Sequence, residues 1–189
     1  GSGLPFTNLS SVCSNDEQAV REAVEGLIAM GHRHFAVIGG NREESDTTRQ
    51  RYRGFLSAVE AHGVEFDPVR DYVCVRFSYQ GGYLAARELG GRRRDYTAII
   101  CMADVMAMGA IRALSDAGLR VPEDVSVIGF DGLPIGEFLT PRLSSVSQSV
   151  EVLAQRSVEL LRASIEGKNA STHEVVPAKI RWRESVRTV

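Results

Sequence analysis

One stretch, residues 97–132, constrains the fold of this chain most. It reads TAIICMADVMAMGAIRALSDAGLRVPEDVSVIGFDG, and its two apolar runs flank a segment with helical spacing. Neither apolar run alternates with polar residues, which is typical of parallel strands covered by helices on both faces. The stretch therefore predicts a βαβ unit. Open sheets of this kind bind ligands at the carboxyl ends of their strands, here beside Asp104 and Asp131.

The same alternation of apolar runs and amphipathic helices precedes this unit. Runs at 35–38 and 72–75 have the length and composition of buried strands. Segments with one apolar face come to an end at Gly31, near Gly63 and at Gly90. Repeated alternation of this kind predicts a parallel sheet with right-handed crossovers. The expected fold class is therefore α/β, with a parallel sheet and helices on both of its faces.

The regular alternation of strands and helices ends after the βαβ unit. A short apolar segment at 133–139 is followed by an extended piece at 143–146. The spacing of apolar residues then predicts a long amphipathic helix over 150–165, and a final extended segment covers 174–184. The sequence contains no internal repeat and no low-complexity linker.

Composition excludes several functional classes. The net charge of −2 and the pI of about 6.1 give no basic surface for direct binding of nucleic acid. No apolar run approaches the roughly 20 residues of a membrane span, and no signal peptide opens the chain. Cys13, Cys74 and Cys101 lack CxxC spacing, which indicates free thiols in a reducing, cytoplasmic compartment. His32 and His34 are too few for a metal site, and no cofactor is expected.

Four segments, taken in order, resemble the lactose/galactose repressor (LacI/GalR) family of transcription regulators. They are GHRHFAVIGG at 31–40, RYRGF at 51–55, the whole stretch 97–132, and RWRESV at 181–186. The resemblance covers almost the whole chain, and its strength lies in the order and spacing of the four segments together. It implies two periplasmic-binding-protein-like (type I) lobes with a small-molecule effector in the cleft between them. A helix-turn-helix headpiece and a hinge helix precede the lobes in this family.

The resemblance also implies a division of the chain. Residues 1–34 would be a remnant of the N-terminal subdomain, namely a strand and a helix. Residues 35–142 would form the C-terminal subdomain that binds the effector and dimerises, and residues 143–189 a crossover helix with strands returning between the subdomains. The N-terminal subdomain would be incomplete, and the headpiece would be missing. The opening Gly-Ser-Gly agrees with a piece excised from a longer regulator.

Two charged residues are the principal candidates for effector binding. Arg51 resembles the family's arginine that holds effector oxygens, and a guanidinium can donate two parallel hydrogen bonds to such groups. Without the resemblance, an exposed helix arginine would be the ordinary interpretation. Asp131 resembles the family's ligand-binding aspartate, whose carboxylate accepts from hydroxyl or N–H groups. The alternative for Asp131 is a turn residue, because Asp before Gly is a common turn pair.

Five further residues are weaker candidates. Ala103 and Asp104 stand where relatives often have Asn-Asp, so the alanine removes a side-chain amide that could face the effector. Asp104 could equally be the N-cap of the next helix. Phe77 follows a strand end and resembles an aromatic residue that stacks on the ligand, but a core phenylalanine is an equal alternative. Asn15 and Asp16 stand near the family's Asp-Asn element, and helix capping explains them as well.

The resemblance implies three kinds of partner. The effector would be a sugar, a sugar derivative or a purine-like molecule. The predicted helix over 104–117 is apolar over most of its circumference, more than one sheet face requires. In the family this helix and the segment matching 133–143 form the dimer contact, so we expect an isologous homodimer. DNA would be contacted only through a headpiece absent from this chain, and no membrane is involved.

Two other functional classes remain as alternatives. A periplasmic solute-binding protein of a transporter shares the fold, although the run GLRVPEDVSVIGFD resembles the regulators. An enzyme could use Asp104 and Asp131 as an acid and a base. The sequence contains no GxSxG, HExxH, Walker loop or GxGxxG after a strand, so we expect a binding module and not an enzyme.

Overall fold

A six-stranded sheet forms the body of the molecule. The computed structural model describes residues 10–92, 95–167 and 171–189. The strands lie in the order β3-β2-β4-β5-β6-β8, and all neighbours are parallel except β6 and β8. Their bounds are β3 (Tyr72–Cys74), β2 (Phe35–Gly39), β4 (Ala98–Cys101), β5 (Ser126–Asp131), β6 (Ser144–Ser147) and β8 (Lys179–Arg181). The predicted parallel α/β fold is confirmed.

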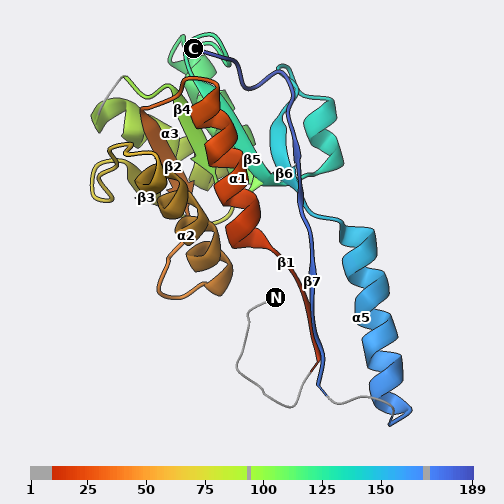
Figure 1. Cartoon of the computed structure of the whole chain (residues 1–189). Coiled ribbons are helices and arrows are strands. Elements are labelled where there is room, and N and C mark those ends of the chain that lie inside the picture. The colour runs from red at the N-terminus through yellow and green to blue at the C-terminus, as the bar shows by residue number, and fades with distance from the viewer. Residues whose placement is uncertain (1–9, 93–94, 168–170) are drawn as a thin grey trace.

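Helices cover both faces of this sheet (Figure 1). They are α1 (Asp16–Ala29), α2 (Asp46–Ala61), α3 (Tyr79–Arg92) and α4 (Asp104–Asp116), and they pack in two pairs, α1 with α2 and α3 with α4. Successive side chains of a strand point to opposite faces. In β4, Ile100 accordingly packs near α1, whereas Ile99 packs between α3 and α4. The apolar runs of the sequence are therefore buried on both sides.

The helix over 16–29 lies elsewhere than expected. The resemblance assigned it to the N-terminal subdomain, but α1 packs on the six-stranded sheet and shares its core. Four of its inward residues, Val20, Ala23, Val24 and Leu27, are at most 3% exposed. The physical reason is its apolar face, which finds a matching apolar sheet surface beside α2. β6 and β8, also expected to belong to the returning segment, complete the same sheet.

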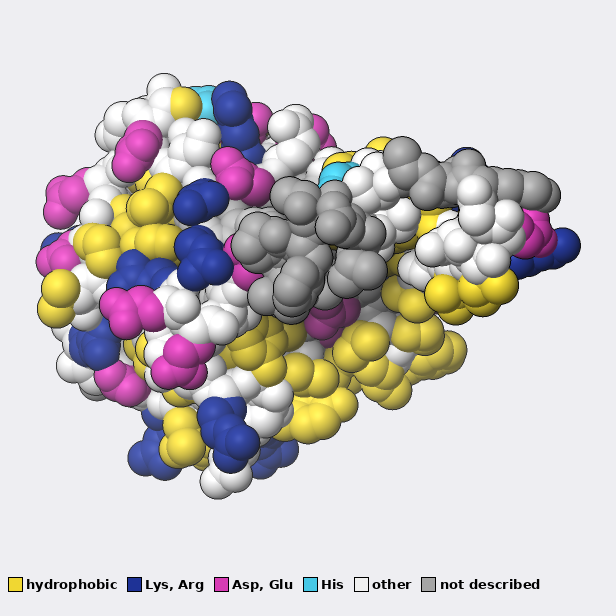
Figure 2. All heavy atoms as spheres, turned by 90° about the horizontal axis from the view of Figure 1, so that it is seen from below, with side chains coloured by type: hydrophobic (Ala, Val, Ile, Leu, Met, Phe, Trp, Pro, Cys, Tyr) yellow, Lys and Arg dark blue, Asp and Glu magenta, His cyan; other side chains and the backbone are white. Residues whose placement is uncertain are grey.

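A smaller unit extends from this body (Figure 1). It consists of a two-stranded parallel sheet of β1 (Ser11–Ser14) and β7 (His173–Val176) with α5 (Val150–Ile165) against it. Leu160 is the buried residue of α5, whereas Val158, Leu161 and Ile165 are at least 62% exposed. Apolar side chains gather on the protruding part in Figure 2. Across the described residues, no helix combines the length and the apolar character that crossing a membrane would require.

A short 3-10 helix, Pro134–Glu137, follows β5 and leads toward β6. Parallel pairing brings the carboxyl ends of β2, β4, β5 and β6 to the same edge of the sheet. In this register Asp131, the last residue of β5, lies opposite Ser147 of β6. The residues that follow these four strands are therefore neighbours in space, as the sequence predicts for a ligand site.

Candidate functional site

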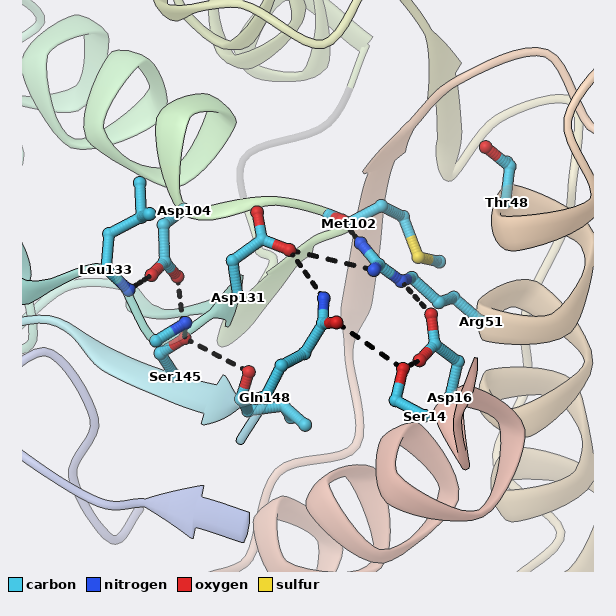
Figure 3. A network of polar contacts seen from close by, with 12 residues as sticks. Ser14, Asp16, Thr48, Arg51, Met102, Asp104, Asp131, Leu133, Ser145 and Gln148 are labelled. Carbon is cyan, nitrogen blue, oxygen red and sulfur yellow. Dashed lines mark hydrogen bonds and ion pairs between the residues drawn. The ribbon is translucent and has the colours of Figure 1, made fainter. Parts of the chain in front are cut away.

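Arg51 is the centre of a polar cluster at the carboxyl edge of the sheet (Figure 3). It extends from α2, whose first turn is capped by the Ser45 side chain accepting from Thr48 N. The Arg51 side chain is 5% exposed, and its Nε donates to Asp16 Oδ2 at 2.7 Å. Its Nη1 donates to the carbonyl of Met102. The ordinary interpretation, an exposed helix arginine, is therefore wrong.

Two further contacts fix the guanidinium. Nη2 lies 3.6 Å from Asp131 Oδ1, and the guanidinium carbon lies 3.5 Å from the centroid of the Phe130 ring. A cation over an aromatic face is attracted by the ring quadrupole. Arg51 and Asp131, each predicted from the sequence as a candidate for effector binding, are thus brought together.

Asp131 is the accessible carboxylate of the cluster. Its side chain is 31% exposed, compared with 7% for Asp16, and its Oδ1 accepts from Gln148 Nε2 at 3.0 Å. Burial raises the pKa of Asp131 to about 6; Arg51 opposes this shift, and the charge of Asp104 adds to it. Its φ of 121° lies in the left-handed region, which L residues rarely adopt. Strained backbone of this kind is found at functional sites, so it supports a binding role for Asp131.

Asp131 should make stability depend on pH. A folded-state pKa of about 6, above the ordinary value near 3.9, means that the fold favours the protonated carboxyl. The stability from this group is present below about pH 4 and is lost as the pH rises through about 6. We expect Asp131→Asn to raise the free energy of unfolding by about 2 kcal/mol at about pH 8 and to have little effect near pH 4.

Urea denaturation across this pH range measures the effect. Glu123→Gln is the matched control, because Glu123 is exposed and its substitution also removes one carboxylate. The control should follow the wild type at each pH. A constant difference between Asp131→Asn and the wild type from pH 4 to pH 8 would contradict the prediction.

Asp104 is buried, and both of its carboxylate oxygens accept hydrogen bonds from the protein. It is 0% exposed; its Oδ1 accepts from Ser145 Oγ at 2.6 Å, and its Oδ2 from Leu133 N at 2.7 Å. Burial raises its pKa, while the hydrogen bonds from Ser145, Leu133 and Gly132 lower it. The N-cap interpretation is wrong, since Ala103 occupies the N-cap position of α4. Asp104 instead ties the loop after β5 to β6 and lies behind Asp131.

Ala103 and Phe77 also lie near this edge. Ala103 is extended and 3% exposed. Phe77 is 42% exposed, so the interpretation as a core phenylalanine is wrong. Its ring covers Gly40, where a Cβ atom would stand 2.5 Å from Phe77 Cε2 and 3.0 Å from Thr48 Oγ1. The Thr48 hydroxyl is buried and has no hydrogen-bond partner among the residues that the structure describes.

Sequence reasoning missed Gln148 and the pairing role of Asp16. Gln148 spans the cluster, because its Nε2 donates to Asp131 and its Oε1 lies 3.5 Å from Ser14 Oγ (Figure 3). Ser14 also donates to Asp16. Gln148 follows the end of β6 at the same edge as Asp131, so its position after the predicted extended piece at 143–146 was the available signal. Asn15 Oδ1 accepts from Ala178 N at 2.7 Å, which does not involve the cluster.

A cavity of about 150 Å³ opens beside the cluster, and its lining includes Asp16, Gln50, Arg51 and Gln148. A larger cavity of about 390 Å³ lies between the ends of α3 and α4, at the opposite edge of the sheet. Its walls are mainly apolar, and the predicted site residues are not among them. We place the candidate site at the first cavity, because several polar groups converge there. In the described part of the chain, no group of His, Cys, Asp and Glu residues is arranged to hold a metal.

Known proteins resemble this chain over nearly its full length. The family described as "Periplasmic binding protein-like domain" matches residues 24–186. The "Probable HTH-type transcriptional repressor ExuR" of Bacillus subtilis (strain 168) is 34% identical, with 95% of this chain and 54% of that protein covered. The "HTH-type transcriptional repressor PurR" of Pectobacterium carotovorum subsp. carotovorum (strain PC1) is 38% identical, with 83% and 46% covered. Both relatives are named as repressors of transcription.

The fold is also similar to that of solved regulators. The structure described as "transcriptional regulator CelR-cellobiose complex" superimposes with a TM-score of 0.90 at 33% sequence identity. The match covers 97% of this chain and 56% of the CelR chain. The present chain thus spans about half the length of the curated relatives that it matches.

Proposed function

Because this chain belongs to the periplasmic-binding-protein-like effector domains of the LacI/GalR regulators, we propose that it binds a small-molecule effector within a DNA-binding transcription regulator. The observation that carries this proposal is the Arg51, Asp131 and Gln148 cluster at the carboxyl edge of the sheet. The CelR structure, which holds cellobiose, favours a sugar-like ligand. Arg51, Phe77 and Asp131 are the proposed contacts, while Ala103 and Asp104 shape the edge behind them.

Effector binding would act on DNA by shifting the balance between two arrangements of the regulator. Residues 1–189 carry a net charge of −2, so we do not expect them to bind operator DNA by themselves. Tight, sequence-specific binding in a gel shift with this chain alone would contradict that part of the proposal.

The binding proposal is tested by titrating the longest natural form of the protein with sugars in a calorimeter. Asp131→Ala should weaken binding of the ligand at least about tenfold, because the hydroxyls that it accepts from would lose their buried partner. Val69→Ala, an 84% exposed position beyond the site, is the control and should bind as the wild type does. Equal affinities for Asp131→Ala and the wild type would show that the ligand binds at another site.

We also propose that the chain forms an isologous homodimer through α4 and the segment 133–143. Val105, Met108 and Ile111 of α4 are half-buried, and Phe138 is 81% exposed. A self-complementary apolar face of this kind is typical of two-fold dimers. The effector site and the dimer face belong to the same six-stranded body, so binding of the effector would influence the dimer contact.

Phe138→Glu tests the dimer. We expect sedimentation of the wild type as a dimer and a dissociation constant at least about tenfold higher for the variant, because the glutamate would be desolvated at the interface. Val69→Glu, at an equally exposed apolar position, should remain dimeric. A wild-type chain that stays monomeric at high micromolar concentration would contradict the proposal.

A further inference from the structure

His32 lies at the C-terminal end of α1, where a Schellman motif ends the helix. Gly31 N donates to the carbonyl of Ile28 at 3.0 Å, and Gly31 has the positive φ, 101°, that this motif requires. His32 N donates to the carbonyl of Leu27 at 3.1 Å. His32 itself is 0% exposed, and its ring centroid lies 6.4 Å from that of Phe35 in β2. The end of the helix therefore places a titratable side chain in the interior.

The segment 185–189, called here the docked segment, lies against the same end of α1 (Figure 1). Arg187 N donates to Ser126 Oγ at 3.1 Å. Val189 N donates to the carbonyl of Met30 at 2.9 Å. The last three residues of the segment are exposed, so hydrogen bonds contribute more to holding them than apolar burial does.

His32 adds a hydrogen bond to the docked segment from the interior. Its Nε2 lies 2.9 Å from the carbonyl oxygen of Arg187, which can only accept, so Nε2 carries the hydrogen. In the neutral ring Nδ1 is then an acceptor. Nδ1 is buried and has no hydrogen-bond partner among the residues that the structure describes. Protonation would place a second N–H at Nδ1, and no described group is there to accept from it.

The surroundings of His32 also disfavour a positive charge. Burial lowers the pKa of His32 from its ordinary value of 6.5. The hydrogen bond to the Arg187 carbonyl opposes this shift, whereas the charges of Arg187 and Arg33 add to it. Arg33 belongs to the loop between α1 and β2, and Arg187 to the docked segment. The last turn of α1 and the whole of β2 contain no ionisable side chain, so neither element supplies a compensating carboxylate.

We propose that His32 is a pH-sensitive latch, whose neutral ring holds the docked segment on α1 and whose protonated ring releases it. A charged imidazole is costly to bury, and water can reach this ring once the segment moves away. Because the fold lowers the pKa of His32, the stability from this group is present above about pH 6.5 and is lost as the pH falls. The sign is opposite to that of Asp131, whose contribution is lost as the pH rises.

Amide hydrogen exchange, followed by NMR on the whole chain, tests the latch. The amides of Arg187 and Val189 report on the docked segment, and dividing their rates by the intrinsic rate at each pH gives an opening constant. We expect this constant to rise about tenfold between about pH 7.5 and about pH 5. In His32→Gln the side-chain amide can still donate to the Arg187 carbonyl but does not titrate. The constant should then change by less than about twofold.

His62→Gln is the matched control. His62 is exposed, and its Nδ1 also lies 2.9 Å from a backbone carbonyl, that of Ala58. This variant should show the same dependence on pH as the wild type. A rise that is equal in His32→Gln and the wild type would overturn the proposal, as would a wild-type opening constant that does not change with pH.

NMR titration of the His32 ring in the wild type keeps the proposal testable if His32→Gln does not fold. We expect the neutral ring to carry its hydrogen on Nε2 and to titrate below pH 6.5, with the docked segment opening over the same range. A ring that titrates at or above pH 6.5 while the Arg187 and Val189 amides stay protected would overturn the latch. These measurements need no effector, so their outcome is independent of the proposed ligand site.

Discussion

Replacing Arg51 with alanine is expected to lower the free energy of unfolding by about 3–5 kcal/mol, because the change leaves buried carboxylate without a cation. The Asp16 side chain is 7% exposed and would lose the bond from Arg51 Nε. The carbonyl of Met102 would lose its donor as well. Asp131 is partly exposed, so water can replace part of its lost interaction with Arg51. The expected effect therefore comes mainly from Asp16 and Met102.

Urea denaturation measures this change, and the neighbouring Arg53 supplies the control. Arg53 lies two residues along the same helix and is exposed, so Arg53→Ala should change the free energy of unfolding by less than about 0.5 kcal/mol. Both variants remove one arginine from α2, which cancels effects of helix propensity. If Arg51→Ala unfolded at the same urea concentration as Arg53→Ala, the Asp16–Arg51 ion pair would contribute nothing to the free energy of unfolding.

Replacing Gly82 with alanine should be the second large effect, lowering the free energy of unfolding by about 3 kcal/mol. An ideal Cβ at Gly82 would overlap the backbone of Met106, with the carbonyl carbon only 2.7 Å away. Gly109 of α4 is in the same situation, since its Cβ would stand 2.7 Å from Tyr83 N. The two helices cross so closely that their backbones touch, and an added methyl group must push them apart.

Gly90→Ala should have the opposite sign. Gly90 belongs to the same helix, but a Cβ there would meet nothing within 4 Å. We expect this variant to gain about 0.5 kcal/mol, because alanine favours the helix over glycine. Thermal unfolding of the two variants beside the wild type compares them directly. A Gly82→Ala protein as stable as Gly90→Ala would show that α3 and α4 can move apart without a loss of stability.

The fold was largely predictable from the sequence, since buried parallel strands produce unbroken apolar runs. The strand β2 begins and ends within one residue of the predicted run at 35–38, and β4 and β5 lie within the predicted βαβ stretch at 97–132. The position of α1 was not predictable in the same way. Its apolar face predicts that it packs against other elements, but the periodicity does not say on which sheet. The resemblance assigned it to the N-terminal subdomain, whereas it packs on the six-stranded sheet.

The site was predictable only in part. Arg51 and Asp131 were each expected at the site, because one lies on a recognisable helix motif and the other at a strand end. Asp16 was considered as part of the family's Asp-Asn element or as a capping residue, although it pairs with an arginine 35 residues away. Such pairs depend on how α1 and α2 pack side by side, which local spacing does not encode. Likewise, the burial of Asp104 follows from β6 lying across it, and β6 is 40 residues further along the chain.

The ribbon of β1 and β7 has a consequence for how the protein is made. Ser11 pairs with His173, 162 residues later in the chain. A ribosome that adds about 5–20 residues per second needs on the order of ten seconds or more to deliver the partner strand. The strands β2, β4 and β5 and their helices are available well before then. The pairing of β1 with β7 can therefore form only after residues 173–176 have emerged, beside a body that has already formed.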